Sequence, residues 1–301
     1  MILVVGATGL VGNEVCRKLR VRNERVRALV RSSSSPEKVA ALQAAGVELS
    51  IGDLKDPDSL ARACRGAEAV ISTASCTLSS QPGDSIESVD AAGQLSLVNA
   101  AKNAGIGRFV FVSFRRTPGL SFPLAEAKSQ VEQAIQSLNF TITQASWFQE
   151  VWLSPALGFD YANAKARIYG AGTKPISWVS FYDVAEFCAV CLRHAAAERK
   201  TIEFGGPEAL TPLDVVARFE TIGGRPFQLE HVPEAALLAQ FENATDSMQN
   251  SFAALMLGYA RGDAMEMKPV VDAFGTRLAS VEDYARRALG RSASHKRSGN
   301  T

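Results

Sequence analysis

The chain opens with an apolar run and a glycine-rich loop, Ile2-Leu3-Val4-Val5-Gly6-Ala7-Thr8-Gly9-Leu10-Val11-Gly12. The apolar run predicts a β-strand and the residues that follow the loop predict a helix. Gly6 allows a sharp turn off the strand, Gly9 allows a phosphate group to approach the backbone, and Gly12 allows the helix to pack tightly on the sheet. The helix N-terminus offers free N–H groups and a positive dipole to an anion. We therefore predict a dinucleotide-binding loop whose contacts are Gly6, Thr8, Gly9, Leu10, Val11 and Gly12.

Apolar runs alternate with amphipathic stretches along the chain, which predicts βαβ units and a parallel sheet covered on both faces. The candidate strands are Ile2–Val5, Arg25–Val30, Val47–Ile51, Ala69–Thr73, Arg108–Val112, Phe140–Gln144, Pro175–Phe181, Thr201–Phe204 and Phe227–His231. The helix-like stretches of the first half are Leu10–Leu19, Pro36–Ala45, Pro57–Ala63, Ile86–Asn103 and Leu124–Leu138. The expected fold class is α/β, a doubly wound Rossmann-type sheet with a smaller, mostly helical C-terminal lobe.

The pattern divides the chain into three parts. Residues 1–150 are expected to form the dinucleotide-binding domain, and residues 151–289 a smaller substrate lobe interleaved with the sheet. Residues 290–301 are polar and basic, which is typical of a disordered tail.

Composition narrows the class of protein. The 301 residues are 47% hydrophobic and 21% charged, with a formal net charge of +1. These values are typical of a globular protein, and they give no electrostatic attraction toward nucleic acid or an anionic membrane. The N-terminus lacks the features of a secretory signal, and no apolar run reaches the roughly 18 residues of a membrane helix. The five cysteines are scattered and odd in number, so we expect a reduced, cytoplasmic protein that binds neither nucleic acid nor membrane directly.

The residues after the second strand bear on the choice of cofactor. NAD-selective sites usually place an acid there to bind the ribose 2′-hydroxyl, but here Val30 is followed by Arg31-Ser32-Ser33. Arg31 suits a bidentate contact with a 2′-phosphate, and Ser32 can donate to the same group. We therefore expect NADP rather than NAD, the alternative being that Arg31 is a solvated surface residue.

Two further clusters have competing interpretations. Trp147, Phe148 and Trp152 suit an aromatic wall for a flat ligand, or equally helix–sheet packing. Cys188 and Cys191 with His194 offer three potential metal ligands, whereas a structural zinc usually needs four. We interpret both cysteines as core residues and expect no metal site.

Together these residues resemble the NmrA-like group of atypical short-chain dehydrogenases. That group includes isoflavone-reductase-like enzymes, quinone and triarylmethane reductases, and non-catalytic NADP-sensing regulators. The resemblance covers about residues 1–220. Besides the loop at Gly6, the matching segments are Gly52-Asp53-Leu54, Ser72-Thr73-Ala74-Ser75, Phe109–Ser113, Ala125–Lys128, Ser177–Ala185 and Gly205–Thr211.

The resemblance implies roles for particular residues. Asp53, with Leu54 beside it, would lie against the adenine, and Thr73 and Ala74 beside the cofactor ribose and phosphates. Lys128 would reach the nicotinamide ribose, and it is with Ser113, at the end of the fifth strand, a candidate catalytic residue. One position departs from the wider pattern, in which a Tyr four residues before the lysine donates a proton. That position is Leu124 here, so carbonyl reduction by the usual route lacks its acid.

Two functional hypotheses follow. The first is an NADPH-dependent reductase that transfers hydride to a flat, apolar small molecule, such as a quinone or enone, which needs no proton from a tyrosine. The alternative is a non-catalytic NADP(H)-sensing regulator or scaffold with a protein partner, consistent with Leu124. A nucleotide-sugar epimerase or dehydratase is less favoured, because it would normally retain the tyrosine.

Overall fold

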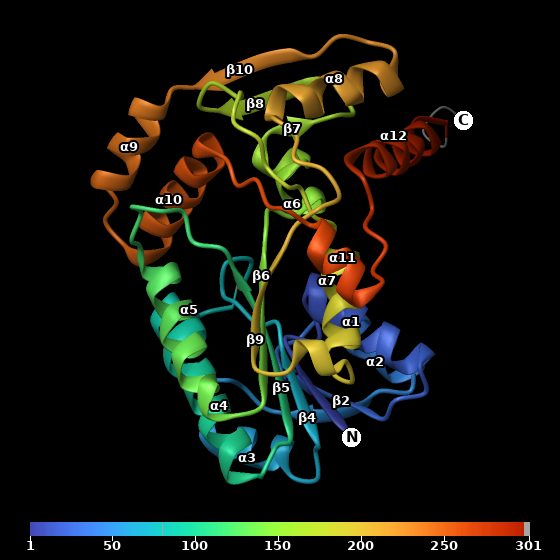
Figure 1. Ribbon diagram of the computed structural model, residues 1–301, viewed down its shortest axis with the longest axis vertical. Coiled ribbons are helices and arrows are strands. Elements are labelled where there is room, and N and C mark those ends of the chain that lie inside the picture. Colours follow the sequence, from blue (N-terminus) through green and yellow to red (C-terminus); the bar gives the residue numbers. More distant parts are fainter. Residues whose placement is uncertain (80, 298–301) are drawn as a thin grey trace.

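A seven-stranded parallel sheet forms the centre of the protein, whose computed structural model describes residues 1–79 and 81–297. The strand order is β3-β2-β1-β4-β5-β6-β9 (Figure 1). The strands are β1 (Ile2–Val5), β2 (Val26–Val30), β3 (Glu48–Ile51), β4 (Ala69–Ser72), β5 (Arg108–Phe114), β6 (Phe140–Ala145) and β9 (Lys200–Phe204). The chain builds outward from β1 to β3 and then returns to add β4 on the other side of β1. This confirms the expected doubly wound fold and places its topological switch point between β1 and β4.

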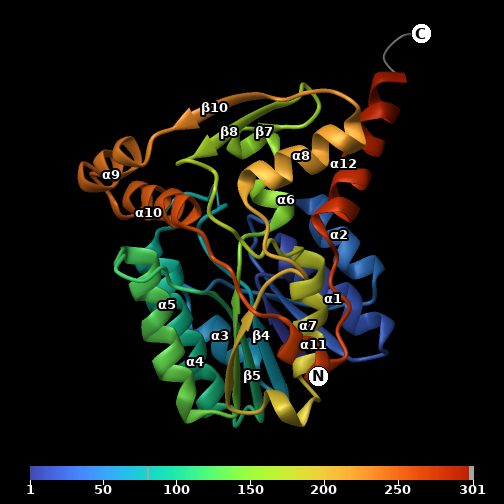
Figure 2. The same ribbon diagram turned by 45° about the horizontal axis from the view of Figure 1, so that its top comes forward.

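Helices cover both faces of the sheet (Figure 2). One face carries α1 (Leu10–Val21), α2 (Pro36–Ala44) and α7 (Phe181–Cys191), and the other carries α3 (Pro57–Cys64), α4 (Gln94–Asn103) and α5 (Pro123–Ala134). Strand β1 explains the arrangement, since Ile2 and Val4 join the core on the α1 face while Leu3 and Val5 join the core on the α4 face. A strand buried on both faces reads as a continuous apolar run, as the sequence does here.

The second half of the chain forms a lobe above the carboxyl ends of the strands (Figure 1). Its helices are α6 (Gln149–Trp152), α8 (Pro212–Gly223), α9 (Glu234–Glu242), α10 (Ser247–Arg261) and α12 (Val281–Arg297), while α11 (Lys268–Phe274) lies beside α7. A small sheet of order β10-β8-β7 joins them, made of β7 (Phe159–Asp160), β8 (Lys165–Tyr169) and β10 (Gln228–Val232). Strand β9 and helix α7 return to the main sheet, so the two halves interleave. The expected helical lobe is confirmed, although only β10 of its small sheet was foreseen.

The remaining elements are short or irregular. A π-helix, η1 (Ile86–Gly93), precedes α4, and there are single 3-10 turns at η2 (Ile135–Ser137), η3 (Pro155–Leu157) and η4 (Ala195–Ala197). The expected strand at Pro175–Phe181 is absent. That segment makes only isolated bridges at Ile176 and Val179, because Ser180 caps α7 by accepting from the Tyr182 N–H and so ends the extended chain.

The chain end also differs from expectation. Helix α12 continues to Arg297, so residues 290–297 are helical where a disordered tail was expected. That stretch contains no proline, the residue that most strongly ends a helix, so its sequence allows α12 to continue. Residues 298–301 of the expected tail lie outside the described residues.

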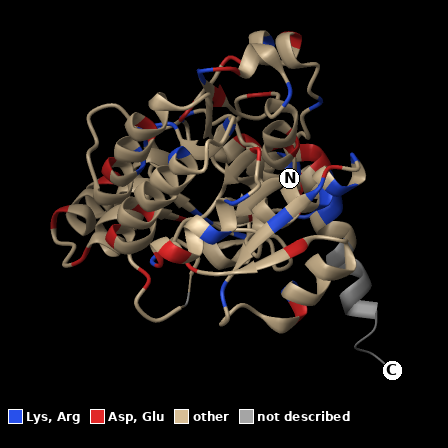
Figure 3. Cartoon of the chain, turned by 90° about the horizontal axis from the view of Figure 1, so that it is seen from below, with Lys and Arg blue, Asp and Glu red and all other residues tan. Residues whose placement is uncertain are grey.

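The surface carries both signs of charge. Seen from below, Lys and Arg are interspersed with Asp and Glu (Figure 3), in keeping with the net charge of +1. Across residues 1–79 and 81–297, none of the helices has the length and apolarity needed to cross a membrane.

Candidate functional site

A cleft of about 580 Å³ lies along the carboxyl ends of β1, β2, β3 and β4, next to the switch point. Ligands of doubly wound sheets bind at this place because the strand order reverses there and opens a crevice. Ten of the residues predicted to contact a cofactor line the cleft: Gly6, Thr8, Gly9, Leu10, Val11, Arg31, Asp53, Leu54, Thr73 and Ala74. The sequence thus located the cleft.

The glycine loop is shaped as its sequence predicts. Gly6 has a φ of +85°, and a Cβ built there would lie 2.7 Å from the Ala74 nitrogen. A Cβ at Gly12 would lie 2.2 Å from the Gly6 carbonyl oxygen, so Gly12 closes the loop from behind and does not line the cleft. Gly9 is different, since a Cβ there would meet only the Gly6 oxygen, at 3.2 Å. Its open side faces the cleft, where a ligand can approach the backbone.

The N-terminus of α1 is free to bind an anion. Gly9 is its N-cap, no side chain bonds to the first turn, and that turn contains no acidic residue. The first N–H groups of a helix have no partner within the helix, and the dipole adds positive potential at the same point. The loop and helix together fit a pyrophosphate.

Arg31 is held by Asp84, which also lines the cleft. Its Nη1 donates to Asp84 Oδ2 at 2.6 Å, and Lys55 Nζ donates to Asp84 Oδ1 at 2.7 Å. Ser79 Oγ also donates to Asp84, at 2.5 Å. Burial alone would raise the pKa of Asp84, but the hydrogen bonds from Lys55, Ser79 and Arg31 lower it to about 2. The carboxylate is therefore ionised, and it fixes the direction of Arg31.

Lys38 is a second cation at this end that the sequence analysis missed. Its Nζ donates to the Thr8 carbonyl at 3.2 Å, and within residues 1–79 and 81–297 it forms no ion pair. Ser35 caps α2 by accepting from the Lys38 N–H, which places Lys38 in the first helical turn beside the cleft. That Ser-Pro capping signal is visible in the sequence and could have identified it. Ser32, predicted as a contact, is exposed and does not line the cleft, whereas its neighbours Ser33, Ser34 and Ser35 do.

The two candidate catalytic residues are buried and do not line the cleft. Lys128 Nζ is 3.3 Å from Asp90 Oδ1 and 4.9 Å from the centroid of the Phe111 ring. Ser113 Oγ donates to Glu132 Oε1 at 2.6 Å, in the interior. Neither side chain is among the described residues that line the cleft, so both roles remain predictions.

Leu124 occupies the position of the missing tyrosine and is 3% exposed. Its side chain belongs to the core on the α4 face, and its N–H donates to Ser251 Oγ of α10 at 3.2 Å. This position therefore serves packing between α5 and α10 in this protein.

The aromatic cluster divides between the two interpretations. Phe148 lines the cleft. Trp147 and Trp152 instead belong to a network of rings in the lobe, with Tyr259 5.8 Å from Trp152 and 5.3 Å from Tyr169 between ring centroids. Only Phe148 is thus placed to contact a flat ligand in the cleft, whereas Trp147 and Trp152 pack within the lobe.

Cys188 and Cys191 are core residues, as expected. Both are fully buried on the face of α7 that packs against the sheet. Burial raises the pKa of the Cys188 thiol to about 12, so the thiol is protonated at neutral pH. A protonated, buried thiol is a poor nucleophile and packs as a small apolar residue.

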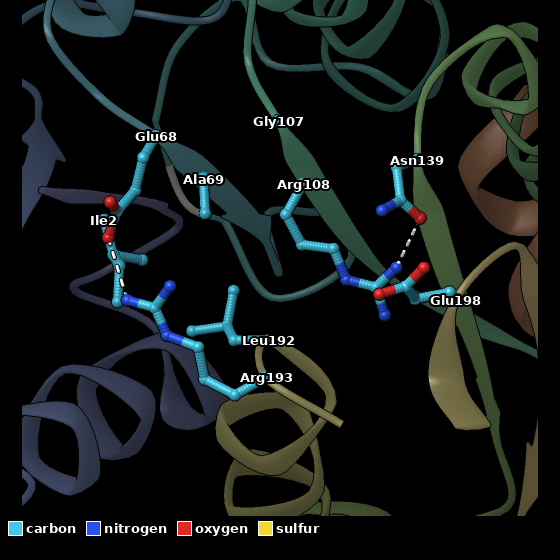
Figure 4. Close-up of a pocket in the computed structure, with 9 residues that line it drawn as sticks. All are labelled: Ile2, Glu68, Ala69, Gly107, Arg108, Asn139, Leu192, Arg193 and Glu198. Atoms are coloured by element: carbon cyan, nitrogen blue, oxygen red, sulfur yellow. Dashed lines mark hydrogen bonds and ion pairs between the residues drawn. The ribbon is translucent and has the colours of Figure 1, made fainter. Parts of the chain in front are cut away.

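A second cavity, of about 250 Å³, lies at the amino ends of the strands (Figure 4). Arg108 crosses its floor and donates to Asn139 Oδ1, the carbonyls of Phe140 and Cys191, and Thr141 Oγ1. Arg193 points to Glu68 on the other side, at 2.9 Å. These side chains already satisfy one another and tie β5, β6 and α7 together, so we interpret this cavity as a structural crevice.

Comparison with known proteins agrees with this geometry. The model of the NmrA-like family matches residues 1–285. The chain belongs to the NmrA-like family. Among curated relatives, photosystem II assembly factor Ycf39 of Synechocystis is 29% identical, covering 96% of this chain and 91% of its own. The isoflavone reductase homolog IRL of Zea mays is 30% identical, covering 96% of this chain and 98% of its own.

Solved structures share the fold of this chain. The NADPH-dependent quinone oxidoreductase of Escherichia coli has a TM-score of 0.77 at 21% identity, covering 96% of this chain and all of its own. That enzyme has also been solved in complex with NADPH. At this level of identity the likeness shows the shared fold, and it names no substrate for the present NmrA-like protein.

Proposed function

We propose that this protein binds NADP(H) in the cleft and transfers hydride from NADPH to a flat, apolar acceptor such as a quinone or enone. The observation that carries the proposal is the uncapped N-terminus of α1 behind Gly9, with Arg31 and Lys38 at the adenosine end of the same cleft. A free helix N-terminus suits the pyrophosphate, and two cations beside it suit a 2′-phosphate.

Each part of the cofactor would have its own contacts in the cleft. The N–H groups of Leu10 and Val11 would hold the pyrophosphate, and Asp53 and Leu54 would lie against the adenine. Lys38 would pair with the 2′-phosphate, with Arg31 oriented toward it by Asp84. Bound NADPH would supply the hydride, so the protein's own task is to orient the nicotinamide toward the acceptor.

A quinone, enone or similar acceptor suits this site better than a simple ketone. Leu124 is buried where a proton-donating tyrosine would stand, so a reaction that draws its proton from solvent after hydride transfer is favoured. Phe148 in the cleft wall offers an apolar surface for a flat ring. The E. coli quinone oxidoreductase of this fold supports the same class of acceptor.

The test follows NADPH absorbance in the presence of the protein and a panel of quinones, enones and aldehydes. Nicotinamide fluorescence establishes separately that NADPH is bound. We expect protein-dependent oxidation with quinones or enones and none with aldehydes. Oxidation restricted to aldehydes would contradict the assignment of the acceptor, and absence of NADPH binding would contradict the proposal as a whole.

A second function, non-catalytic NADP(H) sensing with a protein partner, is favoured by two observations. Leu124 cannot donate a proton from the position that the tyrosine usually occupies. The Ser113 hydroxyl already donates to Glu132 in the interior. The assembly factors among the relatives are consistent with this role. Tight NADPH binding with no oxidation of any acceptor, together with a partner whose recovery changes between NADPH and NADP⁺, would select it over the reductase.

A further inference from the structure

A buried carboxylate outside the expected motifs lies immediately behind the cleft. Asp90 belongs to the π-helix η1 and is fully buried. Its neighbour Val89 is part of the cleft wall. Isolated π-helical turns are rare and occur often at functional sites, because their wider hydrogen-bond spacing changes which side chains face inward.

Close packing brings η1 to this position. A Cβ at Gly93 would lie 2.9 Å from the Leu54 Cβ, so a glycine is required for η1 to approach the loop after β3. Leu54 is itself a cleft residue. The π-helix is therefore built against the wall of the candidate cofactor site.

Side chains of η1 and α4 hold the cleft loop that follows β4. Gln94 accepts from Ser72 Oγ at 2.8 Å and donates to the Ala74 carbonyl at 2.9 Å. One turn earlier, Asp90 Oδ2 accepts from the Cys76 N–H at 2.9 Å. The segment between these contacts contributes Thr73, Ala74 and Ser75 to the cleft.

The other oxygen of Asp90 faces Lys128. Oδ1 lies 3.3 Å from Lys128 Nζ and has no hydrogen-bond partner within residues 1–79 and 81–297. Lys128 is 6% exposed, and its ammonium lies over the ring of Phe111. A buried ion pair contributes little to stability compared with apolar residues of similar volume, because both charges lose their hydration. The position that Asp90 gives to the Lys128 ammonium explains this buried ion pair better than a contribution to the stability of the fold does.

We propose that Asp90 is a positioning residue that holds the Lys128 ammonium behind the cleft loop after β4, from where Lys128 would reach the nicotinamide ribose of a bound cofactor. The inference rests on the proposed binding of NADP(H) in this cleft. Asp90 acts through Lys128 and touches no part of the cofactor. Its second oxygen meanwhile secures the loop after β4 through Cys76.

Asp90→Asn tests the charge alone. Asparagine keeps the shape of the side chain and an oxygen that can accept from Cys76, but it removes the partner of Lys128. Lys128→Met removes the ammonium, and the double variant contains neither charge. Glu186→Gln, which removes an ion-paired carboxylate on α7 away from the cleft, is the matched control.

The readout is equilibrium binding of two ligands, NADPH and adenosine 2′,5′-bisphosphate, which lacks the nicotinamide half. We expect Asp90→Asn and Lys128→Met each to lower the affinity for NADPH about tenfold, which is the effect of losing one charge-assisted hydrogen bond. Binding of adenosine 2′,5′-bisphosphate should stay unchanged, and the double variant should bind NADPH no more weakly than Lys128→Met.

Three results would overturn the inference. The first is unchanged NADPH affinity in Asp90→Asn, and the second is an equal loss for both ligands, which would mean a general loosening of the loop. The third is a double variant that binds NADPH more weakly than Lys128→Met does. This comparison tests the inference even if Asp90→Asn alone fails to fold. If the wild-type protein binds neither ligand, the proposed function itself fails, and that outcome is distinct from the other three.

Discussion

Arg31 and Asp84 meet at one end of the cleft, with Arg31 Nη1 2.6 Å from Asp84 Oδ2. The side chain of Asp84 is 3% exposed and also binds Lys55, so one carboxylate orients two cations from the segments that follow β2 and β3. Much of the charge of Arg31 is thereby compensated within the protein. Lys38 has no such partner among the described residues, and it therefore contributes more free positive charge to this end of the cleft.

Charge reversal at these cations should change the choice between NADPH and NADH. Lys38→Glu removes the less compensated cation, and Arg31→Glu places a second carboxylate beside Asp84. We expect each to lower the ratio of NADPH to NADH affinity by about 10- to 100-fold, the range of one charged hydrogen bond. Fluorescence titration with both nucleotides measures the ratio. Lys102→Ala, on the exposed end of α4, is the control, and a ratio that stays at the wild-type value in both variants would rule out a 2′-phosphate site here.

Two glycines of the loop should respond differently to alanine. At Gly9 the backbone φ is −82° and a new Cβ would make one tight contact, 3.2 Å from the Gly6 oxygen, so Gly9→Ala should still fold, with a small loss of stability. Its methyl group would stand where a pyrophosphate approaches, and NADPH affinity should fall at least about tenfold. At Gly12 the new Cβ would lie 2.2 Å from the Gly6 oxygen, so Gly12→Ala should lose about 1–3 kcal/mol of stability as well. Urea unfolding and NADPH titration separate the two effects, and full NADPH affinity in Gly9→Ala would exclude the assigned phosphate contact.

Restoring the tyrosine should not restore carbonyl reduction. Leu124 is buried in the core between α5 and α10, so Leu124→Tyr must fit a larger, polar side chain into filled space. We expect a loss of about 1–3 kcal/mol and no oxidation of NADPH with aldehydes or ketones. Leu124→Met, of similar volume, controls for the loss of leucine itself. A stable tyrosine variant that gains aldehyde reduction would show that this position faces the reacting atoms.

Asp263 should make stability depend on pH in a direction unusual for a carboxylate. Burial raises its pKa from 3.8 to about 6, despite a hydrogen bond from Ser146 and the nearby Arg115. The folded protein then binds a proton that the unfolded chain releases between about pH 4 and 6, so the free energy of unfolding falls as the pH rises through that window. Ionised Asp263 therefore lowers the free energy of unfolding at pH 7 by at most about 3 kcal/mol.

The test compares Asp263→Asn with the wild type by urea unfolding from pH 4.5 to 7.5. The variant lacks the titrating group, so its stability relative to the wild type should rise with pH and level off above pH 7. Glu242→Gln, an exposed carboxylate at the end of α9, should show no such trend. A difference between variant and wild type that is constant over the whole range would mean that Asp263 ionises normally in the folded protein.

The local sequence pattern was sufficient to predict the main sheet and the position of the cleft. The continuous apolar run at Ile2–Val5 and the glycines after it require a buried strand, a tight turn and a helix start. Such local constraints act within a few residues, and the sequence therefore predicted the main sheet and ten of the residues that line the cleft. The two strands at Phe159–Asp160 and Lys165–Tyr169 were missed because they are short and lack a clear apolar run.

The identity of the first loop and the doubly wound order were thus determined by the sequence itself, through steric rules that glycine and β-branched residues obey wherever they occur. Only the tertiary structure decided that Asp84 reaches Arg31, that Lys38 stands beside Thr8, and that Asp90 pairs with Lys128. Asp84 is 53 positions from Arg31, and Asp90 is 38 positions from Lys128. No helical or strand periodicity in the sequence connects residues so far apart. Their meeting depends on the path of the loop after β4 and on the π-helical turn, which packing of the whole fold sets.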